Sequence, residues 1–197
     1  MVIKLKRIKE EIRILGWDDG PFEFKKKGKT VLVGAVLRGG SFMDGMLKEE
    51  IDVDGIDAEE KIIKAAKRSK FKDLRIIMLD GITFGGFNTV NIQHIYKKTG
   101  LPVIVFNRKK PDFNKFRKAL KKLPHAKKRL GCVEDAGPVF WTRVNEKRVC
   151  FQCTGIDSRD AGKIIQKSAT RSNVPEPLRI AHLIATAIML GESRGRA

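Results

Sequence analysis

The carboxylates that follow predicted strands are the residues of this chain with the clearest potential for chemistry. Residues 76–79 form a branched apolar run that predicts a buried strand, and Asp80 follows it at the start of a glycine-rich loop. A strand predicted over residues 12–17 ends in a similar way at Asp18 and Asp19, before a Gly-Pro break. Clustered carboxylates repel one another unless protons or a divalent cation neutralise them. Carboxylate oxygens are ligands that hard cations prefer, so carboxylates that meet at neighbouring strand ends imply Mg²⁺ or Mn²⁺ as the cofactor.

A third acidic stretch, residues 52–60, precedes a segment with helical spacing that begins at Lys61. Within it, Asp57 and Glu60 are three positions apart, as in a capping box, so helix initiation alone could account for both acids. An Asp-Gly turn could likewise account for Asp18 and Asp19, and an Asp-Gly loop for Asp80, each taken singly. Taken together, three acidic segments at predicted strand or helix ends predict metal binding.

The overall charge predicts a polyanionic partner. The 197 residues include 41 Lys plus Arg against 23 Asp plus Glu, which gives a formal charge of +18 and a pI near 10. The basic residues are spread along the chain and form no membrane-binding amphipathic helix, so nucleic acid is favoured over a membrane. A lysine-rich surface of the thermophilic kind is the alternative explanation. An acidic site in a basic protein suits metal-assisted phosphodiester hydrolysis, in which the cation activates water and stabilises the leaving oxygen.

Other catalytic chemistries find less support in the sequence. Of the three cysteines, Cys150 and Cys153 stand in an alternating apolar pattern, which predicts buried thiols on a strand rather than a disulfide or zinc site. The histidines have no recognisable nucleophile partner, and His182, in a predicted helix, is expected to pack or cap. The glycines after Asp80 match neither P-loop nor dinucleotide spacing, which argues against nucleotide hydrolysis.

The predicted elements give an α/β mixed sheet in a single domain over residues 1–197. Three consecutive strands form an antiparallel meander, and the later strand, helix, strand order implies parallel pairing through right-handed crossovers. This is the order of a ribonuclease-H-like fold, in which the ends of the first and fourth strands are neighbours and Asp18 or Asp19 would approach Asp80. With no membrane-spanning run and no signal-peptide pattern, the chain is expected to be cytoplasmic. The predicted strands cover residues 12–17, 30–37, 42–53, 76–79, 101–106 and a hairpin over 139–153; the predicted helices cover 61–68, 88–98, 112–123, 157–170 and 178–190.

Five segments in collinear order resemble the archaeal endonuclease-V-like family called endonuclease dU. They span nearly the whole chain and comprise residues 14–22, 53–60, 79–88, 99–105 and 175–182. Endonuclease V itself is a more distant resemblance, carried by the strand-end aspartate, the Asp-Gly loop, the Thr-Gly-Leu-Pro strand and the Pro-Glu-Pro-x-Arg-x-Ala-His segment. The resemblance implies an endonuclease-V-like fold and metal-dependent incision of DNA near deaminated bases. Uracil is implied for the closer family and hypoxanthine for endonuclease V, and no protein partner is implied.

The same resemblance assigns roles to the acidic residues. It implies that Asp18 and Asp80 are metal-binding, catalytic aspartates. Asp19 is a further candidate ligand because it stands at the same strand end as Asp18. The Phe-Arg-Glu of endonuclease V is absent here, so the third acid stays open among the residues of the helix-leading stretch. As catalytic or metal-binding candidates these are Asp54, Asp57, Glu59 and Glu60.

A deaminated base must be turned out of the stack to reach such a site. Six residues that follow Asp80 or the fifth predicted strand are expected to form the base pocket, a wedge or a contact to the nucleic-acid strand. They are Thr83, Phe84, Phe87, Asn88, Arg108 and Lys109. Ordinary loop packing is the alternative for the four that follow Asp80. A different hypothesis is a non-catalytic nucleic-acid-binding protein on a nuclease-like scaffold, with RNA as an alternative target. A third is a basic structural or ribosome-associated protein.

Overall fold

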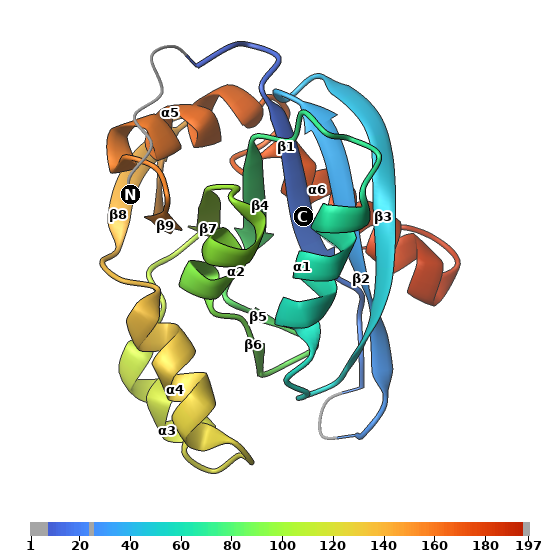
Figure 1. Cartoon of the computed structure of the whole chain (residues 1–197), viewed down its shortest axis with the longest axis vertical. Helices are drawn as coiled ribbons and strands as arrows, with labels where there is room; N and C mark the ends of the chain where they lie inside the picture. Colours follow the sequence, from blue (N-terminus) through green and yellow to red (C-terminus); the bar gives the residue numbers. More distant parts are fainter. Residues whose placement is uncertain (1–7, 24–25, 195–197) are drawn as a thin grey trace.

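A seven-stranded sheet lies between two layers of helices in the computed structural model, which describes residues 8–23 and 26–194 (Figure 1). Within these residues, no helix combines the length and the apolar character that crossing a membrane requires. The strands are β1 (Arg13–Asp19), β2 (Lys29–Arg38), β3 (Phe42–Asp52), β4 (Ile76–Asp80), β5 (Thr83–Phe84), β6 (Asn88–Thr89), β7 (Val103–Asn107), β8 (Phe140–Val144) and β9 (Lys147–Thr154); the helices are α1 (Ala58–Arg68), α2 (Ile92–Thr99), α3 (Phe113–Leu120), α4 (Ala126–Asp135), α5 (Ser158–Ser168) and α6 (Glu176–Leu190).

The sheet has the strand order β3-β2-β1-β4-β7-β9-β8. Strands β3, β2 and β1 pair antiparallel, β1, β4 and β7 pair parallel, and the β8–β9 hairpin completes the sheet antiparallel to β7. The predicted mixed sheet, with an antiparallel meander followed by parallel strands, is therefore confirmed. The first and fourth strands are neighbours at the centre of the sheet, as the sequence predicted.

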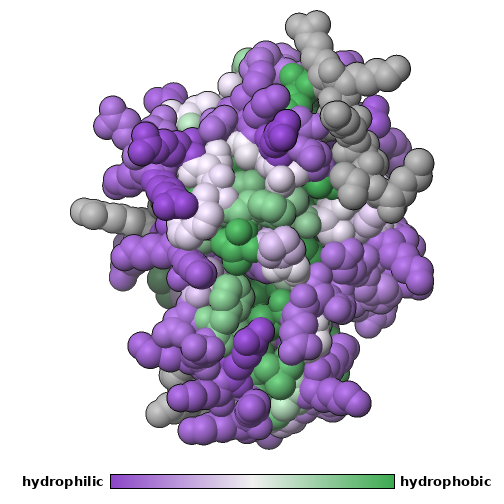
Figure 2. All heavy atoms as spheres, turned by 90° about the vertical axis from the view of Figure 1, so that its left-hand side faces the viewer, coloured by the Kyte–Doolittle hydropathy of each residue, from purple (hydrophilic) through white to green (hydrophobic). Residues whose placement is uncertain are grey.

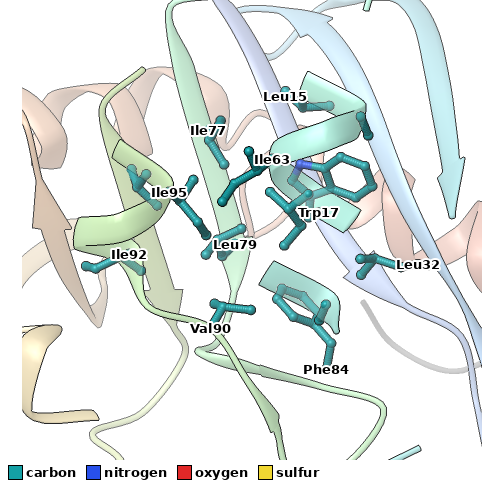
Figure 3. Close-up of a cluster of buried hydrophobic side chains, with 14 of the residues drawn as sticks. Leu15, Trp17, Leu32, Ile63, Ile77, Leu79, Phe84, Val90, Ile92 and Ile95 are labelled. Atoms are coloured by element: carbon teal, nitrogen blue, oxygen red, sulfur yellow. The ribbon is translucent and has the colours of Figure 1, made fainter. Parts of the chain in front are cut away.

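Alternating residues of the central strands divide the core between two faces. Leu15 and Trp17 of β1 and Leu79 of β4 are fully buried against α1 and α2 (Figure 3). The intervening residues, such as Ile14 and Met78, face α5 and α6 instead. Side chains in a strand alternate between faces, so Asp18 at the end of β1 and Asp80 at the end of β4 also face the α6 layer.

The segment after β4 differs from its prediction. A helix was predicted over residues 88–98, but Asn88 and Thr89 form strand β6, which pairs with β5 in a short hairpin. The helix begins only at Ile92, because the Asn91 side chain accepts a hydrogen bond from the His94 N–H at 3.0 Å and caps the helix.

The segment after β7 contains two helices where one was predicted. The helix predicted over residues 112–123 ends at Leu120, and α4 follows it as a separate helix that the sequence did not predict. Only Arg129, Cys132 and Val133 of α4 are buried, so the apolar periodicity that reveals an amphipathic helix is weak there. The hairpin and the last two helices were predicted correctly. The cysteines are free thiols, and the predicted burial is correct for Cys150, whereas Cys153 on β9 is half-buried.

Candidate functional site

Asp18 and Asp80 lie side by side at the carboxyl ends of the two central strands. The parallel register of β1 and β4 pairs Trp17 with Leu79, so the residues that follow are level with each other. Trp17 and Leu79, which precede the two acids, pack toward α1 and α2. Because strand side chains alternate between faces, both carboxylates face the opposite layer, which contains α6. The structure therefore brings together two of the acids that the sequence singled out.

Helix α6 contributes His182 to this pair of acids. The helix passes close to β1 at Gly16, where a Cβ atom would come within 2.6 Å of Pro177, so only glycine permits this approach. His182 Nδ1 then lies 2.8 Å from Asp18 Oδ2, and this hydrogen bond raises the pKa of His182. From sequence, His182 was expected to pack or cap. The resemblance of residues 175–182 to endonuclease V was the feature of the sequence that could have indicated that His182 lies at this site.

Burial and mutual repulsion raise the pKa values of two carboxylates at this site. Burial and the negative charge of Asp18 raise the pKa of Asp80 to about 7, although Arg108 and His182 act in the opposite direction. The Arg108 guanidinium lies 3.8 Å from Asp80 Oδ2. Burial and Asp18 also raise the pKa of Asp19 to about 7, while a hydrogen bond from the Gly85 N–H at 2.9 Å lowers it. Carboxylic acids that titrate near neutrality favour either a proton or a cation.

The donor set fits a magnesium ion better than a zinc ion. Within residues 8–23 and 26–194, no three His, Cys, Asp or Glu side chains converge as a metal-binding cluster. Mg²⁺ commonly uses one or two carboxylates and completes its octahedron with waters and substrate phosphates, whereas structural Zn²⁺ takes four protein ligands. The Asp80 side chain is 21% exposed and the Asp18 side chain 10%, so solvent reaches the pair. Asp18 and Asp80 could thus hold a hydrated hard cation.

The helix-leading acids have other partners. Asp54 Oδ1 accepts a hydrogen bond from the Phe87 N–H at 2.8 Å. The predicted capping box is wrong, since the Asp57 side chain makes no cap and instead accepts from Asn88 Nδ2 at 2.7 Å. Glu60 pairs with Lys64 on the exposed surface of α1, at 2.6 Å. These contacts secure the β3–α1 loop and α1, and none of them joins the acids to the Asp18 and Asp80 pair.

Two of the expected base-pocket residues belong to the core. Phe84 is 1% exposed and packs in the cluster under α1 and α2 (Figure 3). Asn88 is fully buried, and its side-chain oxygen accepts from the Ala58 N–H at 3.1 Å. Neither side chain can contact a base without unfolding, so the packing alternative is correct for them.

The remaining strand-contact candidates reach the surface. Thr83 is half-buried, and Phe87 is half-buried with its ring centroid 5.8 Å from that of Phe116 on α3. Arg108 and Lys109 are both exposed after β7, with Arg108 beside Asp80. Of these four residues, Arg108 is the one with a contact to the acid pair that the structure shows.

Arg129 is a structural residue of this region that the sequence did not reveal. It is 1% exposed, and burial lowers the pKa of its guanidinium. The guanidinium donates to the carbonyls of Asp54 and Gly55 in the β3–α1 loop, of Phe87 in the hairpin and of Pro124 before α4. One side chain thus fixes three loops. The sequence did not predict the burial of Arg129 because it did not predict α4.

The fold defines the class of protein: it is the mixed α/β fold of endonuclease V. Endonuclease V from Bacillus subtilis matches with a TM-score of 0.60 at 15% identity, over 95% of this chain and 85% of that one. Endonuclease V from Ciona intestinalis, in complex with a 23mer DNA containing an inosine followed by a ribo-adenosine, matches with a TM-score of 0.56 at 14% identity, over 86% and 82%. At such identities the likeness concerns the fold alone.

The chain belongs to the endonuclease dU family, whose model matches residues 10–189. A UPF0215 protein of Methanosarcina barkeri is 49% identical over 191 residues, which cover 96% of this chain and 97% of the relative. A crystal structure of a protein of unknown function from Archaeoglobus fulgidus matches with a TM-score of 0.81 at 41% identity, over 89% of this chain and 97% of that one. The resemblance inferred from the sequence is confirmed.

Proposed function

We propose that this protein is a Mg²⁺-dependent endonuclease that nicks DNA near deaminated bases, with uracil as the first substrate and hypoxanthine as the second. The observation that carries the proposal is the level placement of Asp18 and Asp80, two crowded carboxylates at the centre of an endonuclease V fold. The raised pKa of Asp80 supports cation binding, because a divalent ion relieves the repulsion that burial and Asp18 create. The net charge of +18 supports a nucleic-acid substrate.

The side chains of the site have distinct tasks in this proposal. A bound divalent cation supplies Lewis-acid polarisation of the phosphate and activation of water. Asp18 and Asp80 hold that cation between adjacent strands, and His182 orients the Asp18 carboxylate through its hydrogen bond. Arg108, beside Asp80, attracts the phosphate oxygens. Thr83 and Phe87, which reach the surface of the β5–β6 hairpin, are the proposed contacts to the displaced base.

The test is incision of labelled duplex oligonucleotides that carry uracil, hypoxanthine or no lesion, with Mg²⁺ or with EDTA. Wild-type protein should nick the uracil strand only with Mg²⁺, and Asp80→Asn should abolish nicking. Glu60→Gln is the matched control, because this exposed carboxylate pairs with Lys64 on α1, and it should retain activity. Full activity of a folded Asp80→Asn variant would refute the proposed site.

A non-catalytic nucleic-acid-binding protein, directed to DNA or RNA, is the second candidate. It is favoured by the two-carboxylate donor set, which includes no third protein ligand among the described residues. Calorimetric titration with Mn²⁺ separates the two functions. A nuclease should take up the ion in a manner that Asp18→Asn and Asp80→Asn both eliminate, and a pure binder should show no carboxylate-dependent uptake.

A further inference from the structure

A basic pocket of about 490 Å³ lies next to the acid pair. Three segments form it: the chain after β7, the tip of the β8–β9 hairpin and the loop that precedes α6. Its lining contains four cationic side chains and no carboxylate. This basic pocket is defined by Arg108, Lys109, Lys147, Arg148, Ser172 and Val174.

The walls of the basic pocket are joined to each other. Asn145 and Glu146 adopt φ angles of 44° and 64°, which makes a tight turn and presents the next two residues at the hairpin tip. Asn145 Nδ2 donates to the Ser172 carbonyl at 3.2 Å and so connects the hairpin to the loop before α6. Within that loop the Val174 N–H donates to Ser172 Oγ at 3.1 Å. The pocket is therefore largely formed before any ligand arrives.

Three of the four cations of the basic pocket have no carboxylate partner among the described residues. In the described part of the chain, Lys109, Lys147 and Arg148 form no ion pair with a carboxylate, and Glu146 at the turn is exposed and outside the lining. Arg108 belongs both to this pocket and to the acid site, because its guanidinium lies 3.8 Å from Asp80 Oδ2. The two sites share a side chain, so a ligand that spans both would be continuous across Arg108.

An exposed aromatic residue contacts one of the cations of the basic pocket. The Arg148 guanidinium stacks over Trp141 at 4.2 Å from the ring centroid, and Trp141 on β8 is 41% exposed. Figure 2 looks onto the side of the molecule that carries β8, α3, α4 and α5. A paler, partly hydrophobic strip runs down the middle of this side, with hydrophilic residues around it. Cations flanking an exposed aromatic ring are typical of surfaces that bind a nucleic-acid strand by its phosphates and stack its bases.

We propose that the basic pocket binds the phosphate adjacent to the scissile one, so that the substrate strand runs from Asp18 and Asp80 across Arg108 to the β8–β9 hairpin. Lys147 and Arg148 contact that phosphate, and Trp141 stacks on a neighbouring base. The direction of the strand rests on the proposed function, which places the scissile phosphate at the acid pair. Binding by the pocket itself can be measured without cleavage.

The first test uses charge reversal in the absence of metal. Affinity for a labelled single-stranded oligonucleotide carrying uracil is measured by fluorescence anisotropy, in EDTA, over a series of salt concentrations. Lys147→Glu with Arg148→Glu should weaken binding on the order of tenfold and lower the salt slope by about 0.7, since both residues contact one phosphate and each lost single-strand phosphate contact accounts for about 0.7. The control, Lys67→Glu with Lys72→Glu, reverses two exposed charges at the opposite end of β4 from Asp80 and should change affinity less than about twofold. Equal losses in the two double variants would overturn the inference.

The second test uses the two tryptophans of the chain. Trp17 is fully buried, whereas Trp141 is exposed, so quenching of emission by a bound strand reports on Trp141. Saturation with the oligonucleotide should quench the emission of wild-type protein, and Trp141→Phe should remove the change. Unaltered emission at saturation would contradict strand binding at this surface.

The two proposals fail in different ways. If Lys147→Glu with Arg148→Glu loses affinity and quenching but wild-type protein never nicks DNA, the proposed function is wrong and the binding pocket stands. If nicking depends on Asp80 and Mg²⁺ while the double variant binds and nicks like its control, the nuclease stands and the strand path is wrong.

Discussion

Two carboxylate and histidine pairs occupy opposite faces of the sheet and differ in what surrounds them. Asp18 contacts His182 on the α6 side, and Glu59 contacts His94 Nδ1 between α1 and α2. The second oxygen of Glu59 accepts from the Asn91 N–H at 2.7 Å, so both of its oxygens are used to hold the start of α2. The Glu59 pair is thereby complete within the protein.

Asp18, in contrast, has a second acid beside it. Asp80 is level with it on the adjacent strand, and burial together with Asp18 raises the pKa of Asp80 to about 7. The contrast teaches that a hydrogen bond between a carboxylate and a histidine does not by itself mark a functional site. What distinguishes the Asp18 site is the neighbouring carboxylate of Asp80, whose negative charge is only partly compensated by Arg108 and His182.

The largest expected difference between the two pairs is catalytic. Asp18→Asn removes one of two proposed cation ligands, so nicking of uracil-containing DNA with Mg²⁺ should fall by roughly 10³-fold or more. Glu59→Gln keeps the shape and one acceptor of a structural side chain, so the rate should fall less than about tenfold. Single-turnover rates on the same duplex measure both. A similar loss in both variants, with both folded, would remove the distinction between the pairs.

The next effect concerns stability on the Glu59 side of the sheet. Arg129→Met retains the volume of the stem but leaves four carbonyl acceptors without their donor, so the free energy of unfolding should fall by about 3 kcal/mol. Urea unfolding followed by circular dichroism measures the change. Arg117→Met, on the exposed surface of α3, is the control and should stay within about 0.5 kcal/mol of wild type. A loss as small as that of the control would show that Arg129 does not secure the loops.

The sequence was sufficient for the features that depend on periodicity and strand order. The apolar runs before Asp18 and Asp80 predicted two buried strands, and the order of elements made those strands neighbours. These two inferences brought Asp18 or Asp19 close to Asp80, and the family resemblance pointed to Asp18. The β8–β9 hairpin and α6 were predicted for the same reason, because their apolar patterns are long and regular.

The features that were missed depend on contacts between distant segments. His182 reaches Asp18 because Gly16 lets α6 approach β1, and neither residue announces this contact in its own segment. Phe84 and Asn88 stand in a glycine-rich loop that suggested exposure, yet the short β5–β6 hairpin folds them into the core. Residues whose role is set by tertiary packing carry no local pattern from which that role can be predicted.

An intermediate effect is expected from the two histidines. His182→Gln loses the imidazole that orients Asp18, so the Mg²⁺ concentration for half-maximal nicking should rise about 10- to 100-fold, as for other residues that support metal ligands. His94→Gln should leave this concentration unchanged, because Glu59 is not proposed to contact the ion. Rates measured across a Mg²⁺ titration test both variants. An unchanged Mg²⁺ requirement in His182→Gln would mean that its contact with Asp18 is structural, as in the Glu59 pair.

The smallest effect is the pH dependence of stability in the metal-free protein. The pKa of Asp80 rises from 3.8 to about 7 on folding, so the folded chain holds a proton that the unfolded chain releases, and stability should fall as pH rises from about 4 to about 7. Asp80→Asn should flatten the part of this fall that is due to Asp80 and leave the contribution of Asp19, whose pKa is also raised. Melting temperatures in EDTA across this range measure the slope. Addition of Mg²⁺ at pH 8 should then stabilise wild-type protein and not Asp80→Asn, because a cation replaces the proton only where both carboxylates remain. Identical pH profiles for the two proteins would mean that Asp80 is not under electrostatic stress, and the contrast with Glu59 would lose its physical basis.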